Sequence, residues 1–157
     1  MKKISTLFIM CSFAFSIATV SFAMDHDKMM AGMGNVAHEE VVEGVKATFK
    51  VMSMKDRMKE MNMEMPKGIK ETHHIMVEFK DTKTGKPLTA GEVKIKIQGP
   101  DKTEQVKDLM AMGGMAGMGA GFGADFDLSK KGKYGVMSKF QLKDGKTRNA
   151  KFWYEVK

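Results

Sequence analysis

Methionine is the residue whose number and spacing most strongly suggest chemistry in this chain. The sequence has 18 methionines in 157 residues, and most lie in polar or glycine-rich surroundings. Thioether sulfur is a soft, neutral ligand that suits Cu(I) or Ag(I) and binds hard cations poorly. Short spacings allow two or three sulfurs to converge on one ion. Three clusters have such spacings: Met24, Met29, Met30 and Met33; Met52, Met54, Met58, Met61, Met63 and Met65; and Met110, Met112, Met115 and Met118.

Two other roles for methionine remain open. It is a flexible side chain that fills gaps in a core or makes an adaptable contact surface for apolar partners. It is also oxidised reversibly to the sulfoxide, so a clustered set can serve as a sink for oxidants. The core role suits Met137, which lies between Val136 and Ser138 on a predicted strand. For the three clusters we favour metal binding, because thioethers remain available as ligands in an oxidising compartment.

Histidine adds a second type of ligand near one of these clusters. His73 and His74 precede Met76, and the two-residue period of a strand places His74 and Met76 on the same side. Imidazole and thioether together suit copper in both oxidation states. The sequence therefore predicts a folded copper site. Its expected ligands are His73, His74, Met76, Met110 and Met112, with Met115 and Met118 on the adjoining glycine-rich loop.

Residues 1–23 have the pattern of a secretory signal peptide. Lys2 and Lys3 precede an apolar run, and the segment closes with the small-x-small pattern Ser21-Phe22-Ala23. Polar residues interrupt the run, which favours removal over retention as a transmembrane helix. The approach to Cys11 is a poor lipidation signal. We therefore expect a periplasmic or secreted protein with no stable membrane span after cleavage, and with no cysteine once Cys11 has left.

Cleavage after Ala23 predicts a second metal site at the new N-terminus. Met24 then supplies a free α-amine, and His26 occupies the third position of the mature chain. The amine, two deprotonated backbone amides and the imidazole provide four nitrogens in a square plane, a geometry suited to Cu(II) or Ni(II). Cleavage one residue away removes this site. The alternative is a disordered acidic tail with an incidental histidine.

Other chemistries find little support in the sequence. The formal net charge is +7, but the lysines are scattered and no platform of aromatic and basic residues appears, so we expect no nucleic-acid partner. Asp125 and Asp127 flank Phe126 and share a face of a predicted strand, where they fit a polar rim or a hydrogen-bonding pair. No Ser-His-Asp arrangement, phosphate-binding glycine loop or zinc-protease helix can be assembled. We expect a protein that is not an enzyme.

Alternating apolar residues predict the strands that must position these ligands. Residues 24–44 have the composition of a flexible Met- and His-rich tail, and residues 45–157 have that of a β domain. Strands are expected near 45–51, 72–80, 92–98, 104–112, 122–128, 133–142 and 148–156. About seven short strands separated by turn signals predict an all-β fold, an immunoglobulin-like antiparallel β-sandwich. A barrel is the structural alternative.

The segment 52–65 reads as a Met-rich insertion in this β domain. Met54, Met58, Met61 and Met65 recur at helical spacing, so that a short helix and a methionine-bearing loop both fit. Pro66 and Gly68 end the segment. On the strand that follows it, we expect Ile75, Val77 and Phe79 to face the core, with His74, Met76 and Glu78 on the opposite side.

Four short motifs resemble the exported immunoglobulin-like modules called YtkA-like domains. The motifs are His74-Ile-Met-Val-Glu-Phe, Thr84-Gly-Lys-Pro-Leu, Gly91-Glu-Val-Lys-Ile and Gly132-Lys-Tyr-Gly-Val. The resemblance covers about half of the chain after residue 23 and implies a β-sandwich. Several relatives are associated with copper handling or with assembly of copper-containing respiratory enzymes, so it also implies a metal-linked role. Segment 52–65 and loop 113–121 look like elaborations on that pattern.

These observations together predict a periplasmic copper-binding protein that acts as a chaperone or buffer. Its tail is expected to capture ions first, and an envelope protein such as a copper enzyme or transporter is a possible partner. The alternative is a non-enzymatic interaction module whose methionines form an adaptable contact surface. A third hypothesis is the oxidant sink.

Overall fold

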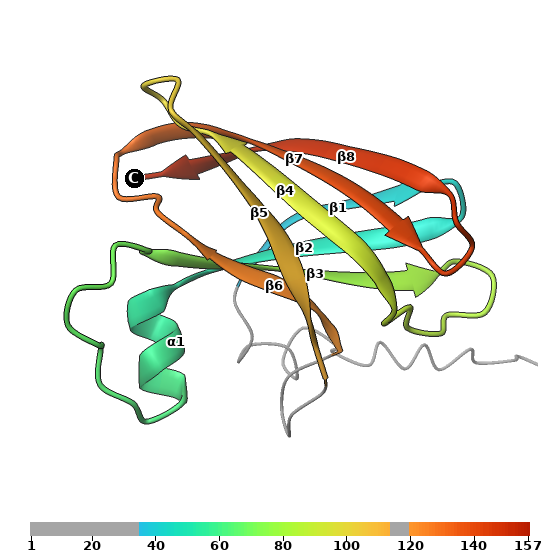
Figure 1. The fold of residues 1–157 in the computed structure, drawn as a ribbon, viewed down its shortest axis with the longest axis horizontal. Coiled ribbons are helices and arrows are strands. Elements are labelled where there is room, and N and C mark those ends of the chain that lie inside the picture. The colour runs from blue at the N-terminus through green and yellow to red at the C-terminus, as the bar shows by residue number, and fades with distance from the viewer. Residues whose placement is uncertain (1–34, 114–119) are drawn as a thin grey trace, which may run out of the picture.

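The computed structural model describes residues 35–113 and 120–157, which form eight strands and one helix (Figure 1). The elements are β1 (Asn35–Val42), β2 (Val45–Ser53), α1 (Met54–Glu60), β3 (His73–Asp81), β4 (Gly91–Gln98), β5 (Glu104–Met112), β6 (Gly121–Phe126), β7 (Gly132–Leu142) and β8 (Thr147–Val156). Within these ranges no helix is long and apolar enough to cross a membrane.

The described strands pair antiparallel in the order β1-β2-β3-β6-β5-β4-β7-β8 and fold over into two layers (Figure 1). One layer holds β1, β2, β3 and β6, and the other holds β4, β7 and β8. Strand β5 joins them, because its residues 104–109 pair with β4 and its residues 110–112 pair with β6. The all-β antiparallel fold is confirmed, and its curled sheet combines features of the expected sandwich and of the alternative barrel.

Aromatic and aliphatic side chains between the two layers form the core. Ile75, Val77 and Phe79 face inward from β3, as the alternation predicts, and all three are at most 1% exposed. The predicted inward positions of β4 are also confirmed, since Val93, Ile95 and Ile97 are buried. The largest fully buried side chains are Phe49, Phe79, Phe122, Phe126, Phe140, Ile75, Ile95, Ile97, Leu128, Val77 and Val136.

Strand β1 corrects the prediction of a flexible tail over 24–44. Residues 35–42 pair with β2 through a two-residue turn in which Glu43 and Gly44 both have positive φ (46° and 78°), the backbone geometry of tight hairpins. The alternation was not recognisable because the inward positions of β1 include His38 and Glu40, opposite Phe49 and Ala47. Residues 24–34 lie outside the described residues.

The edge strands β1 and β8 contact each other on the side of the sheet away from β5. The ring of His38 stacks on that of Phe152, with centroids 4.9 Å apart and planes inclined by 12°. Phe152 also packs against Phe49 of β2, with centroids 5.0 Å apart. Aromatic packing therefore brings β1 and β8 together, although these two strands are not paired by hydrogen bonds in the described sheet.

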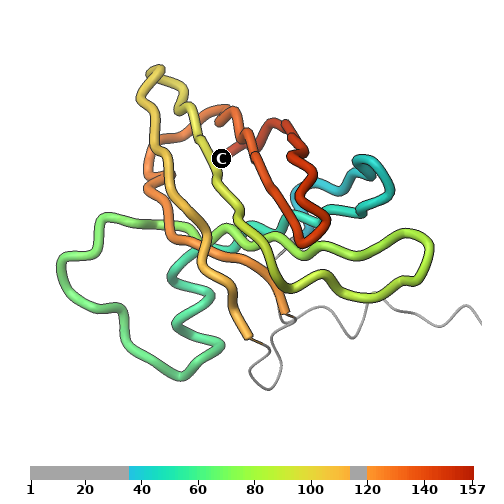
Figure 2. The backbone as a smooth tube through the Cα atoms, turned by 45° about the vertical axis from the view of Figure 1, so that its right-hand side comes forward, coloured from blue at the N-terminus to red at the C-terminus, as the bar shows by residue number. Residues whose placement is uncertain are grey.

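Helix α1 decides between the two structures expected for the Met-rich insertion. Ser53 caps it by accepting a hydrogen bond from the Asp56 backbone amide (3.1 Å), and Met54 and Met58 are buried beneath it. The helix ends at Glu60, and the chain then runs as a long loop away from the sheet before it returns as β3 (Figure 2). Met63 and Met65 lie on this loop and are 56% and 45% exposed. The first methionines of the insertion thus pack the helix, and the later ones face solvent.

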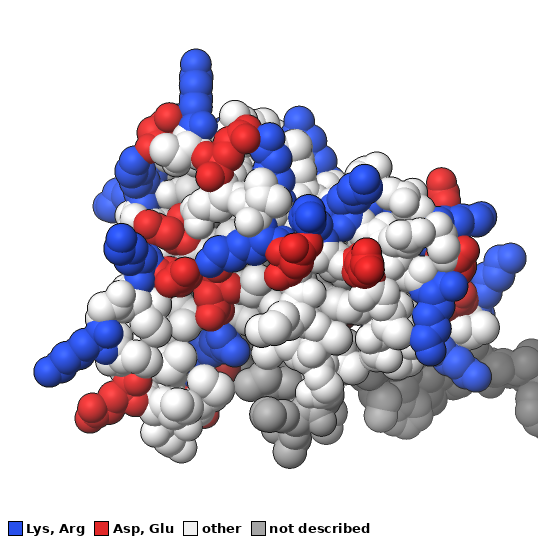
Figure 3. All heavy atoms as spheres, viewed as in Figure 1, with Lys and Arg blue, Asp and Glu red and all other residues white. Residues whose placement is uncertain are grey.

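Basic and acidic side chains intermingle on the face of the molecule seen in Figure 3. Neighbouring strands pair Lys94 with Asp108 (3.2 Å) and Lys96 with Glu104 (2.8 Å). Such exposed pairs contribute little to stability and keep the surface hydrated.

Candidate metal centre

The outer face of β3 carries the side chains that the sequence assigns to the metal site. His74, Met76 and Glu78 lie on this face, opposite the core residues of the same strand. Although they point away from the core, they are only 8%, 7% and 7% exposed. A histidine and a methionine are therefore held side by side in a largely desolvated surface layer.

Glycine on the neighbouring strand β6 makes room above the sheet for two donor atoms. A Cβ atom added to Gly123 would lie 2.7 Å from His74 Nε2 and 2.7 Å from Met112 Sδ. These distances are shorter than any real Cβ contact, so the missing side chain is what allows both atoms to reach this point. His74 comes from β3 and Met112 from β5, the strands on either side of β6. Imidazole nitrogen and thioether sulfur thus converge over Gly123.

Met76 lies beside the same glycine on the other side of the strand pairing. It lies opposite Gly123 in the pairing of β3 with β6, and its Cγ would be 3.5 Å from a Cβ placed on Gly121. Met112 lies opposite Gly121 on the other side of β6. The space that side chains at Gly121 and Gly123 would occupy is therefore taken by neighbouring atoms, with Met76 on the β3 side of β6 and Met112 on the β5 side.

The other ring nitrogen of His74 is held by a carboxylate. His74 Nδ1 lies 2.6 Å from Asp125 Oδ1, and Arg57 Nη1 donates to the same oxygen at 3.0 Å. Arg57 belongs to α1 and Asp125 to β6, so a helix and a strand both hold the ring. The hydrogen bond with His74 lowers the pKa of Asp125 below its usual value, and the positive charge of Arg57 acts in the same direction. Asp125 is therefore an ionised acceptor.

A buried ion pair continues the outer face beyond Met76. Lys50 Nζ lies 2.7 Å from Glu78 Oε1, with the two side chains 4% and 9% exposed. Lys50 is the β2 residue opposite Met76. The lysine charge is thus neutralised by Glu78 beside the methionine.

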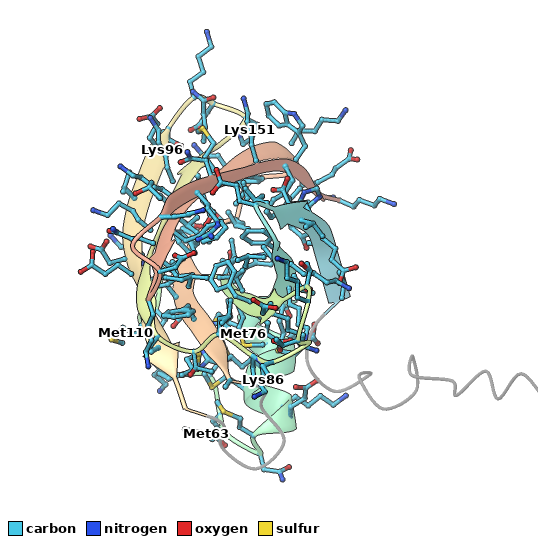
Figure 4. All side chains as sticks on the ribbon, turned by 90° about the vertical axis from the view of Figure 1, so that its right-hand side faces the viewer. Met63, Met76, Lys86, Lys96, Met110 and Lys151 are labelled. Atoms are coloured by element: carbon cyan, nitrogen blue, oxygen red, sulfur yellow. The ribbon has the colours of Figure 1, made fainter. Side chains whose placement is uncertain are left out.

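The structure does not bring all of the predicted ligands together. His73 lies on the opposite side of β3 from His74, with Nδ1 2.9 Å from Thr72 Oγ1 and its ring edge-on to Tyr154. Burial lowers the pKa of His73 below its usual value. Met110 shares the face of Met112 but is 78% exposed, and Figure 4 shows it at the margin of the molecule while Met76 lies further in. His73 thus lies on the other face of the sheet from Gly123, whereas Met110 is the β5 residue opposite Gly123 but is largely exposed.

The remaining predicted ligands cannot be placed. Met24, His26, Met115 and Met118 lie outside the described residues. The square-planar N-terminal site and the contribution of the glycine-rich loop therefore remain predictions.

The donors around Gly123 suit a soft metal ion. His74 Nε2 and Met112 Sδ are the converging atoms, and Met76 is the nearest further thioether. Across residues 35–113 and 120–157, no cluster of three or more His, Cys, Asp or Glu side chains could hold a metal. The group around Gly123 differs from such a cluster because two of its candidate donors are methionine sulfurs, whose chemistry favours Cu(I) or Ag(I).

Sequence reasoning missed Gly123, Asp125 and Arg57. Gly121, Gly123 and Asp125 share one face of β6 by simple alternation, and this pattern was legible in the sequence. Their meeting with His74 depends on the pairing of β3 with β6, which joins segments far apart in the chain. Local periodicity carries no information about that pairing.

Comparison with known proteins identifies the fold. No family model matches the sequence, and no curated protein matches it. FetP from uropathogenic Escherichia coli strain F11, as isolated after expression in the periplasm, is 11% identical with a TM-score of 0.59, over 77% of this chain and 93% of FetP. A copper-bound variant of FetP is 10% identical with a TM-score of 0.61, over 79% and 92%.

A DUF4426 family protein from Pseudomonas aeruginosa has a similar fold. It is 15% identical with a TM-score of 0.56, and the alignment covers 76% of this chain and 96% of that protein. At such identities the likeness concerns the fold. The β fold implied by the resemblance to YtkA-like domains is confirmed.

Proposed function

We propose that this protein is an exported copper-binding protein that holds Cu(I) over Gly123. The observation that carries the proposal is the convergence of His74 Nε2 and Met112 Sδ on one point 2.7 Å from each. Met76 is the third proposed ligand, and it lies opposite Gly123 in the pairing of β3 with β6. The proposed role is binding without catalysis, as a chaperone or a buffer.

The chemistry of the donors supports monovalent copper. Imidazole and thioether are neutral, and thioether sulfur is soft, so the set suits Cu(I) and Ag(I) better than a hard divalent cation. Asp125 contributes an anion close by, but its Oδ1 accepts from Arg57 and contacts His74 on the side of the ring away from Nε2. The proposed ligand atoms are therefore neutral, and the thioether sulfurs among them are soft donors.

The structural neighbours support the same role. One of them is a copper-bound variant of FetP, and FetP was obtained from the periplasm. The signal-like segment 1–23 agrees with export of this chain. Export would place the domain where thiol ligands are lost to disulfide formation and thioethers are not.

Two finer features belong to this proposal. The N-terminal group of Met24 and His26 is a proposed Cu(II) site that captures ions before they reach the folded centre. An envelope copper enzyme or transporter is the proposed recipient. Mass spectrometry of the protein from its native envelope tests the first feature, because it reports both the N-terminus and any bound ion.

Competition against a chromophoric Cu(I) chelator tests the central proposal. The wild-type protein should retain at least one equivalent of Cu(I), and the double substitution His74→Ala with Met76→Ala should weaken that retention by at least about tenfold. Met137→Ala is a matched control, since Met137 lies on β7 and outside the three methionine clusters. Failure of the wild type to retain Cu(I) would overturn the proposal.

Exposed apolar side chains favour a second candidate, a protein-interaction module. Met63, Met65 and Ile69 lie on the loop between α1 and β3 and are 56%, 45% and 40% exposed. Flexible methionines suit adaptable contacts. Pull-down from envelope extracts with and without a copper chelator separates the candidates, because association that ignores both the chelator and His74→Ala favours the module.

A further inference from the structure

Asp125, Arg57 and His74 form a compact group behind the proposed copper ligand. Asp125 Oδ1 is 2.6 Å from His74 Nδ1 and 3.0 Å from Arg57 Nη1, and Arg57 Nη1 is 3.1 Å from His74 Nδ1. The side chains of His74 and Arg57 are only 10% and 18% exposed, whereas that of Asp125 is 38% exposed. The ring is therefore fixed from one side by charged partners on two different elements.

These contacts favour one placement of the ring proton. An ionised carboxylate only accepts hydrogen bonds, and arginine only donates them. With a proton on Nδ1, the ring donates to Asp125 across the shorter contact of 2.6 Å, and Arg57 donates to the same carboxylate oxygen. Neutral His74 then has its lone pair on Nε2, the atom that faces Met112 across Gly123.

We propose that Asp125 and Arg57 are positioning residues that hold His74 in the Nδ1–H tautomer with Nε2 beside Gly123. This inference rests on the proposed function, since it concerns the same Cu(I) ligand. Asp125 acts directly on the ring. Arg57 acts through Asp125 by fixing the carboxylate and by linking α1 to the site. Outer hydrogen bonds of this kind orient metal-binding histidines and raise their basicity.

The experiment reads the tautomer of the metal-free protein and the Cu(I) affinity in parallel. Long-range 1H–15N NMR correlations of ¹⁵N-labelled protein, recorded at alkaline pH, show which imidazole nitrogen carries hydrogen. Three variants accompany the wild type: Asp125→Ala, Asp125→Asn and Asp108→Ala. Asp125→Asn keeps an oxygen acceptor near Nδ1 and removes the charge. Asp108 is a matched control on β5, whose carboxylate is 80% exposed and pairs with Lys94.

The wild type and Asp108→Ala should both show the Nδ1–H form of His74. Asp125→Ala should shift His74 towards the Nε2–H form and weaken Cu(I) binding by about 10- to 100-fold. Asp125→Asn should keep the Nδ1–H form and bind within about tenfold of the wild type. Arg57→Met should weaken binding less than Asp125→Ala, because it leaves the ring its direct acceptor. Folding of each variant is followed by the dispersion of its amide NMR spectrum.

Two results would overturn the positioning role while the proposed function stands. One is an Nε2–H form of His74 in the wild type that binds Cu(I). The other is a folded Asp125→Ala variant with the tautomer and Cu(I) affinity of Asp108→Ala. Absence of Cu(I) binding by the wild type is a different failure, since it removes the proposed function itself, whatever the tautomer of His74.

Discussion

His74 Nε2 and Met112 Sδ both lie within 2.7 Å of the position that a Cβ atom of Gly123 would occupy, although the two residues lie on strands separated by β6. Only a residue without a side chain permits this approach at that point. On the outer face of the β3-β6-β5 sheet, a nitrogen and a sulfur donor therefore occupy the space of the missing side chain. The predictions below test the ligands, the packing around them and the charged groups that support the fold.

Gly123→Ala should block the proposed centre. The new methyl group would meet both donor atoms at 2.7 Å and force them apart. We expect Cu(I) affinity to fall by at least about tenfold and stability to fall by about 1–3 kcal/mol through overpacking. Chelator competition and urea unfolding measure the two effects. Gly113→Ala is the control, because a Cβ there meets nothing within 4 Å. Wild-type affinity in Gly123→Ala would argue against this location.

Met112→Leu should separate ligation from packing. Leucine keeps the size and apolar character of methionine but removes the sulfur, so we expect Cu(I) affinity to fall by at least about tenfold with less than about 1.5 kcal/mol lost from stability. Met110→Leu should change neither property measurably, since Met110 is 78% exposed on the same strand. Chelator competition with Cu(I) measures the affinities. Equal losses in both variants would contradict the assignment of Met112.

Phe79→Ala should strongly destabilise the domain. Phe79 is 1% exposed and packs against Phe140, with ring centroids 4.4 Å apart. Truncation of a buried phenylalanine costs about 3–5 kcal/mol, because it removes apolar burial and leaves a cavity. Urea unfolding followed by circular dichroism gives the change in free energy. Val106→Ala, at a 55% exposed position, should cost far less. A loss below about 1 kcal/mol for Phe79→Ala would be inconsistent with this core.

Glu78→Gln should destabilise the protein, because it leaves a buried charge without its partner. Lys50 and Glu78 are 2.7 Å apart with side chains 4% and 9% exposed, so removal of the carboxylate leaves the ammonium uncompensated. Breaking a buried pair in this way costs about 3–5 kcal/mol. The double substitution Lys50→Met with Glu78→Leu should recover most of the loss, because it removes both charges. Thermal and urea unfolding of the wild type, Glu78→Gln and the double variant measure these stabilities. A double variant less stable than Glu78→Gln would contradict this explanation.

Asp144 should make stability depend on pH in the acidic range. The hydrogen bond from Arg148 lowers the pKa of Asp144 from 3.8 to about 2 in the folded protein. A carboxyl group whose pKa is lower when folded stabilises the protein above its ordinary pKa, and this contribution is lost as the pH falls through the folded value. The Arg148 side chain is only 3% exposed, so it depends on this partner.

The Tm difference between the wild type and Asp144→Asn tests this contribution. It should be largest above the ordinary pKa of 3.8 and should shrink as the pH approaches about 2. Thermal unfolding across a pH series provides the measurement. Asp108→Asn is the control, since its exposed pair with Lys94 should contribute little at any pH. A difference that stays constant with pH would rule out this assignment.

The β strands were largely predictable from the sequence because in most of them the side chains of one face are buried in the core, which produces an alternating apolar pattern. Val45, Ala47, Phe49 and Val51 alternate in β2 with more exposed or ion-paired residues, and this two-residue period survives in the fold. Strand β1 could not be found in that way, since His38 and Glu40 occupy inward positions. It is held by its hairpin with β2 and by the stacking of His38 on Phe152, which local hydropathy does not reveal.

The candidate site was predictable only in part for a related reason. Alternation correctly placed His74 and Met76 on one face of β3. It could not show that β6 would pair with β3, so Asp125 was predicted only as part of a polar rim or a hydrogen-bonding pair, although it contacts His74. The same rule separates His73 from His74, because consecutive strand residues point to opposite faces. Strand order, rather than residue type, decided which of the predicted ligands meet.

The core joins its two layers by contacts between aromatic and aliphatic side chains, and the chain's single cysteine, Cys11, lies outside the described residues. Reductants that keep copper monovalent in solution consequently have no sulfur–sulfur bond to break in this domain. Its melting curve should be the same with and without dithiothreitol, and metal titrations can be performed under conditions that would unfold a disulfide-stapled module of similar size.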